Sequence, residues 1–115
     1  MLTTALLVFA VTAIGGLLLA ARILMGKQAP WSVSIIHALI GASGLIMLIM
    51  TVLDGTGGAR VISALALLII AALGGFYLAS IHLKGKLAPK SIVVVHAGVA
   101  VAGFLTLASV VIGLQ

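Results

Sequence analysis

The sequence predicts an all-α membrane protein, a four-transmembrane-helix up-down-up-down bundle built from two tandem two-helix repeats. Three observations predict it: the composition, four long uncharged stretches, and a sequence repeat. Of the 115 residues, 64% are hydrophobic and only 6% are charged, whereas a soluble domain carries about 25% charged residues. Because one membrane crossing needs about 20 apolar residues, the chain has room for four crossings and for no extramembrane catalytic domain.

Four uncharged stretches have the length of membrane-spanning helices. Each is continuously apolar, without the alternation of a transmembrane β-strand, so we expect helices. The first lacks a basic segment before it and is followed by three more, so we interpret it as a mature helix and not as a signal peptide. The expected spans are Leu2–Ala21, Trp31–Leu53, Val61–Leu83 and Ser91–Leu114.

Short connections join these spans. The second connection is rich in glycine, which is typical of a turn, and the first and third each contain one proline. Pro30 and Pro89 suit the first position of a helix, where a missing N–H is not needed. Connections this short make consecutive helices antiparallel neighbours, which predicts a bundle in one domain over residues 1–115.

The basic residues predict the orientation of the bundle. Five of the six Lys and Arg residues lie at the connections 22–30 and 84–90, whereas Arg60, beside Asp54, lies at the other side. Cytoplasmic loops carry an excess of Lys and Arg. We therefore expect the two lysine-containing loops in the cytoplasm and both termini outside.

The chain repeats itself at an offset of 59 residues without a gap. Chance matches among Leu and Ala would not also align a glycine pair, a lysine, a proline and a histidine. Since each repeat holds two spans, we expect parallel repeats related by a pseudo-two-fold axis along the membrane normal, over approximately 2–53 and 61–114. The matching residues include Gly15-Gly16 with Gly74-Gly75, Lys27 with Lys86, Pro30 with Pro89, His37 with His96, and Gly44 with Gly103.

Most catalytic chemistry is excluded by composition. The chain has no cysteine, and Asp54 is its only carboxylate side chain, so it has neither a carboxylate pair nor a His–acid partner for a serine nucleophile. The glycine-rich turn is not followed by the Lys-Ser or Lys-Thr of a phosphate-binding loop. Six cations spread over short loops do not form a nucleic-acid-binding face. We predict no catalytic residue, and any redox role would be electron transfer through a bound cofactor.

His37 and His96 are the candidate site. Each follows its proline by seven residues, so the two rings should lie at equal depth, roughly 10 Å along helices at diagonal corners of the bundle. A polar ring at that depth should face the interior. On the same helix face stand Gly41 and Gly44 after His37, and Ala100 and Gly103 after His96.

Two uses of these small residues are open. They could let helices pack closely, with each His bonded to a neighbouring helix. They could instead make room for a flat tetrapyrrole with the two His nitrogens as axial ligands, since diagonal helices lie roughly 12–14 Å apart.

With His facing His and a glycine beyond each, at Gly44 and Gly103, the chain resembles the small b-type cytochromes of bacterial inner membranes. The resemblance implies one bis-His haem b between the second and fourth helices, electron transfer, and location in the bacterial inner membrane. Many such cytochromes carry two haems, whereas this chain offers one symmetric His pair, which indicates a single haem or none. Lys27 and Lys86 could pair with the haem propionates.

Other interpretations stay open at the level of sequence. The His pair could hold the magnesium of a chlorophyll-type pigment. The chain could instead be a cofactor-free accessory subunit, packed in the lipid bilayer against a larger respiratory or photosynthetic complex or in a homo-oligomer. The glycine pairs Gly15-Gly16 and Gly74-Gly75 favour close packing of that kind. A channel or transporter is disfavoured because the spans contain few polar residues.

Overall fold

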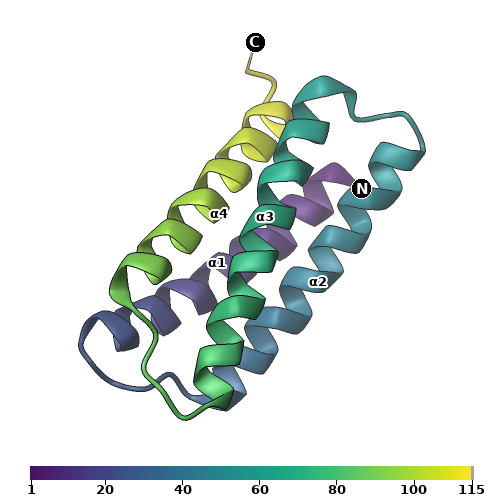
Figure 1. Cartoon of the computed structure of the whole chain (residues 1–115). Helices are drawn as coiled ribbons and strands as arrows, with labels where there is room; N and C mark the ends of the chain where they lie inside the picture. The colour runs from purple at the N-terminus through teal and green to yellow at the C-terminus, as the bar shows by residue number, and fades with distance from the viewer. Residues whose placement is uncertain (115) are drawn as a thin grey trace.

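Four helices make up nearly all of the protein. The computed structural model describes residues 1–114 as α1 (Leu2–Leu24), α2 (Trp31–Leu53), α3 (Gly58–Leu83) and α4 (Lys90–Val111). All four are long and apolar enough to cross a membrane. The connections 25–30 and 84–89 lie at one end of the molecule, here called the lysine end, and the α2–α3 connection lies at the other end with both termini (Figure 1). The longest dimension, 42 Å, is close to the full thickness of a bilayer, about 40–45 Å.

The helix ends differ in detail from the sequence prediction. Pro30 and Pro89 cap α2 and α4 from outside, with ψ angles of 132° and 133°, instead of occupying the first helical position. α2 covers the expected span Trp31–Leu53, and α4 begins at Lys90, one residue before the expected Ser91. At the other end of α4, the helix stops at Val111 instead of Leu114. Gly113, at φ +76°, takes the left-handed conformation that closes the helix and that side-chain-bearing residues avoid.

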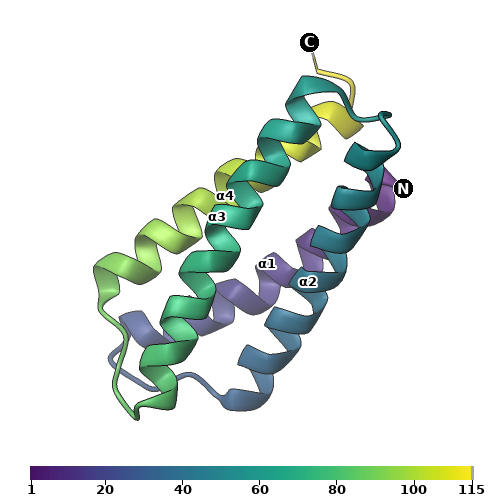
Figure 2. The same cartoon turned by 45° about the vertical axis from the view of Figure 1, so that its right-hand side comes forward.

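The helices form two hairpins that face each other. α1 packs on α2 and α3 packs on α4, and the hairpins meet where α1 contacts α4 and α2 contacts α3. Within residues 1–114, the backbones of α2 and α4 do not come close to each other, so the two helices stand at diagonal corners. Figure 2 shows the two pairs from the side, with α1 and α2 joined at the lysine end.

The core has two apolar clusters separated along the bundle. The larger lies toward the termini and includes the fully buried Leu48 and Leu107. The smaller, at the lysine end, is built on Ile23, Ala29 and Val93. Outward-facing side chains are apolar as well: Leu17, for instance, is 65% exposed. An exterior this apolar favours lipid over water as its surroundings.

Glycines let the helices of each hairpin approach closely. A Cβ on Gly44 would lie 2.8 Å from the Phe9 ring of α1, and one on Gly103 would lie 2.8 Å from Cγ of Leu68 on α3. Both distances are below contact, so only glycine admits these side chains. Phe9 and Leu68 are themselves 59 residues apart, like the glycines they cover. The same contact therefore recurs in both hairpins.

Gly103→Ala should destabilise the bundle, whereas Gly98→Ala on the same helix should not. The new methyl group at 103 would overlap Leu68 and come within 3.2 Å of Cβ of Leu67, but nothing lies within 4 Å of position 98. Overpacking of this kind costs about 1–3 kcal/mol. The free energy of unfolding, measured by SDS titration in mild detergent, checks the pair, and equal stability of the two variants would refute this packing.

Candidate functional site: a histidine pair between the hairpins

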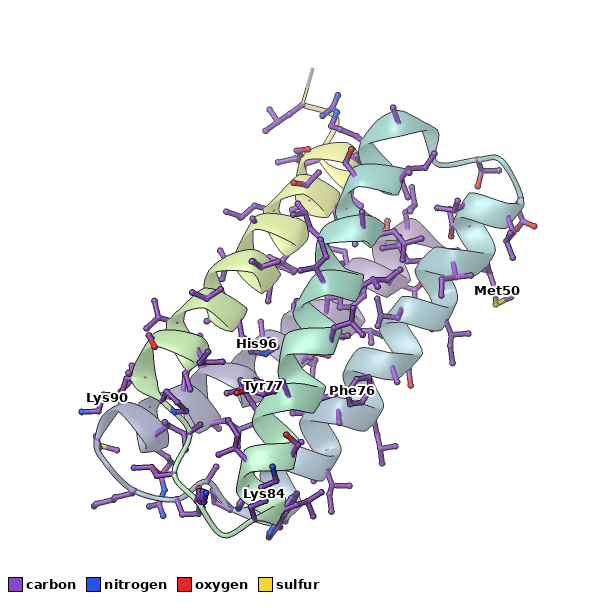
Figure 3. The ribbon with its side chains drawn as sticks, in the orientation of Figure 1. Met50, Phe76, Tyr77, Lys84, Lys90 and His96 are labelled. Carbon is purple, nitrogen blue, oxygen red and sulfur yellow. The ribbon has the colours of Figure 1, made fainter. Side chains whose placement is uncertain are left out.

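His37 of α2 and His96 of α4 meet in the middle of the bundle. Their ring centroids lie 6.5 Å apart, and the ring planes are inclined by 79°. Both side chains are half-buried, and His96 is seen among the helices, away from Lys84 and Lys90 at the lysine end (Figure 3). Along α4, His96 lies between Val93 of the smaller cluster and Leu107 of the larger one. The pair thus occupies the layer between the two cores.

His37 packs against two consecutive glycines of α1, the other helix of its hairpin. Cβ atoms on Gly15 and Gly16 of α1 would stand 3.8 Å from the His37 Cβ and 2.9 Å from its Cε1, respectively. The absence of side chains there lets the Nδ1–Cε1 edge of the ring come close to α1. Its Nδ1 is 2.9 Å from the backbone oxygen of Thr12, so the ring is held toward α1 at one nitrogen.

His96 packs in the same way against two consecutive glycines of α3. Cβ atoms on Gly74 and Gly75 would stand 3.5 Å from its Nδ1 and 3.2 Å from its Cε1. Ala71 stands at the position that matches Thr12, but its backbone oxygen makes no hydrogen bond with the ring, and Nδ1 of His96 is buried without a partner. His37 is therefore oriented by its own hairpin, whereas His96 is held mainly by packing.

The Thr12 contact fixes the chemistry of the His37 ring. A carbonyl oxygen only accepts hydrogen bonds, so Nδ1 must carry a proton and donate it. In the neutral ring this leaves the lone pair on Nε2. No hydrogen bond to Nε2 of His37 or of His96 is present within residues 1–114. Nε2 of each ring therefore has no hydrogen-bond partner in this part of the chain and could donate a lone pair to a metal.

The pair suits two axial ligands of one metal better than it suits a bare ion. Residues 1–114 hold no cluster of three or more His, Cys, Asp or Glu side chains, so an ion held by the protein alone would have an incomplete shell. Metal–imidazole bonds are about 2.0–2.1 Å long, so two ligands on opposite sides of one metal have ring centres about 6 Å apart. The observed 6.5 Å fits that arrangement, and a tetrapyrrole would supply the remaining ligands.

The other residues predicted for the site lie in three different settings. Gly44 and Gly103 are covered by Phe9 and Leu68, and a Cβ on Gly41 would meet the Thr12 methyl group at 3.3 Å. Ala100 is half-buried on α4. The lysines lie in the two exposed connections at the lysine end, where the Gln28 side chain donates a hydrogen bond to the Lys86 backbone oxygen, 3.1 Å away.

Sequence reasoning missed how the histidines are seated. The glycine pairs were expected to aid packing in general, whereas they accept the imidazole rings themselves. Their signal was their presence in both repeats. A second missed contact is the stack of His82 on Trp31, with ring centroids 3.8 Å apart and planes within 6°. This stack joins the start of α2 to the end of α3 at the lysine end. His82 is therefore not part of the central pair.

Comparison with known proteins adds no assignment to this geometry. No protein-family model, no curated protein and no solved structure matches the chain. What the site can do therefore follows from its own atoms: two imidazoles from different hairpins, with ring centroids 6.5 Å apart, one of them oriented by a backbone carbonyl.

His37 should be found as the tautomer with the proton on Nδ1. The Thr12 carbonyl requires a donor at that nitrogen, 2.9 Å away. Nitrogen-15 NMR of histidine-labelled protein in micelles, assigned with the His82→Gln and His96→Gln variants, distinguishes the two tautomers by their nitrogen shifts. A proton found on Nε2 of His37 in the neutral protein would contradict the described hydrogen bond.

Proposed function

We propose that this is a small integral membrane protein that binds one tetrapyrrole, haem b, between α2 and α4 through His37 and His96, for electron transfer. The observation that carries the proposal is the 6.5 Å approach of two imidazoles from opposite hairpins. The proposal includes an up-down-up-down bundle of two tandem repeats in the bacterial inner membrane, with the lysine end in the cytoplasm and both termini outside.

The repeated contacts support the tandem origin of the hairpins. Three pairs of positions 59 residues apart make the same interactions: His37 and His96 rest on glycine pairs of the preceding helix, Phe9 and Leu68 cover a glycine of the following helix, and Leu48 and Leu107 are fully buried. An ancestral homodimer of hairpins would have contained one His in each subunit, with both facing its symmetry axis.

The protein's own residues have distinct roles in this proposal. Nε2 of His37 and Nε2 of His96 would hold the haem iron. The Thr12 carbonyl holds the His37 ring through Nδ1, which is the usual means of orienting a metal-bound imidazole. A metal on Nε2 of His96 would fix the ring that now has an unpartnered Nδ1. Haem bound there would supply one-electron redox chemistry, and the apolar clusters on both sides would limit the access of water to it.

The charge of the site also suits a macrocycle. Neutral imidazoles bring no charge into the apolar layer, and no acid side chain lies within the spans, since Asp54 lies at the end of the molecule away from the lysines. Lys27 and Lys86, both exposed at the lysine end, are the residues we propose for the two propionates.

A second candidate is a cofactor-free accessory subunit of a larger membrane complex. It is favoured by one observation: Phe9 and Leu68 fill the space over Gly44 and Gly103. In this interpretation the small residues serve close helix packing, as is common in membranes, and the His rings are structural. The two functions predict different spectra.

Substitution of either central histidine should remove the cofactor. We expect a dithionite-minus-oxidised absorption spectrum of the protein purified in detergent to have the Soret, α and β bands of six-coordinate b-type haem. His37→Ala and His96→Ala should each lose these bands, because one ligand cannot hold the low-spin state. His82→Ala is the matched control, since His82 stacks on Trp31 outside the pair, and it should retain full occupancy.

Circular dichroism of each variant establishes that helix content is unchanged. Bands that persist in both central variants would refute ligation by this pair, and a featureless spectrum of the wild type from haem-replete cells would favour the accessory subunit. Long-wavelength red bands in place of haem bands would identify a chlorophyll-type pigment.

A further inference from the structure

An apolar groove lies between α1 and α2 at the lysine end. It has a volume of about 290 Å³ and runs along the C-terminal half of α1 to the start of α2. Its lining is aliphatic except for one cation at its edge. The lining residues are Leu18, Leu19, Ala21, Arg22, Met25, Pro30 and Val33.

Arg22 is held in place at this groove by the neighbouring connection. Its Nε and Nη2 both donate to the backbone oxygen of Gln28, at 3.3 Å and 3.1 Å. A carbonyl carries no net charge, so these bonds orient the guanidinium without neutralising it. The side chain is exposed, and its Nη1 makes no hydrogen bond within residues 1–114. Arginine in such a setting is well suited to a phosphate, which it can bind with two donors at once.

The whole lysine end lacks a counter-charge within the chain. Arg22, Lys27, Lys84, Lys86 and Lys90 lie there, and the only carboxylate side chain, Asp54, lies at the opposite end. These cations are therefore free to attract anions from outside the protein. A cation beside an aliphatic groove matches a molecule with an anionic head and an apolar tail.

We propose that this groove binds one anionic phospholipid, with its phosphate on Arg22 and one acyl chain along Leu18, Ala21 and Val33. The site belongs to the first hairpin alone. At the matching positions of the second hairpin, Ile81 replaces Arg22 and the larger Tyr77 replaces Leu18. A second apolar groove of about 350 Å³, between α1 and α4, is lined by Ala, Gly, Val and Leu only, so it has no group to recognise a lipid head.

Lipid selectivity of the purified protein tests this site. Native mass spectrometry with equimolar phosphatidylglycerol and phosphatidylcholine of the same acyl chains should show preferential retention of phosphatidylglycerol. Arg22→Gln should lower that preference about fivefold, the effect expected for one basic residue at a membrane surface. Arg60→Gln is the control. Arg60 is also exposed and also donates to a backbone carbonyl, that of Leu114, but at the other end of the molecule, and its loss should leave the preference unchanged.

Two further experiments distinguish binding of a lipid from binding of a free anion. Ala21→Phe, which places a ring in the groove, should reduce retention of phosphatidylglycerol while Arg22 is kept. Inorganic phosphate added in millimolar excess should not displace the lipid, because the acyl chain contributes to binding. Unchanged selectivity in Arg22→Gln, an equal loss in Arg60→Gln, or displacement by phosphate alone would each overturn the proposal. None of these outcomes depends on whether the His pair binds haem.

Discussion

The architecture depends on one steric constraint, the seating of an imidazole ring against a helix that has no side chain at two successive positions. Gly15-Gly16 and Gly74-Gly75 remove the atoms that would otherwise hold α1 away from His37 and α3 away from His96. With each ring against its own hairpin, the two hairpins can face each other across the central layer. The rings then meet at 6.5 Å, instead of projecting into lipid, where an unpaired polar group is costly.

The two halves of the site are alike in packing and unlike in hydrogen bonding. The Thr12 carbonyl accepts the Nδ1 proton of His37, whereas Ala71 leaves Nδ1 of His96 without a bond. Burial of an unsatisfied polar atom costs about 1–3 kcal/mol. A metal on the other ring nitrogen, Nε2, would not supply this missing partner. The protein alone therefore holds the His37 ring more firmly than the His96 ring.

Composition and periodicity predicted much of the fold from the sequence. In lipid, the backbone N–H and C=O groups of a continuously apolar stretch find hydrogen-bond partners within that stretch when it forms a helix. Four such stretches therefore predict four helices. The ends were less predictable: Pro30 and Pro89 proved to be caps outside the helices, and Gly113 ended α4 early. Such details depend on single ψ and φ angles that hydropathy does not encode.

The site was predictable to the level of residues but not of contacts. The repeat drew attention to His37 and His96, and their equal spacing from the prolines predicted equal depth. It could not reveal that Phe9 covers Gly44 while Leu68 covers Gly103, because partners across helices depend on helix rotation. Nor could it predict the Arg22 groove, which exists in one repeat and depends on hydrogen bonds to the Gln28 carbonyl.

We propose that one metal is held by two imidazoles whose planes are steeply inclined. Electron paramagnetic resonance of the oxidised protein, isolated from haem-replete cells, tests it most directly. Since the ring planes are inclined by 79°, the account predicts the strongly anisotropic low-spin ferric signal of near-perpendicular bis-imidazole ligation. A high-spin ferric signal would contradict it, as would a low-spin rhombic signal from parallel rings or the absence of any haem signal.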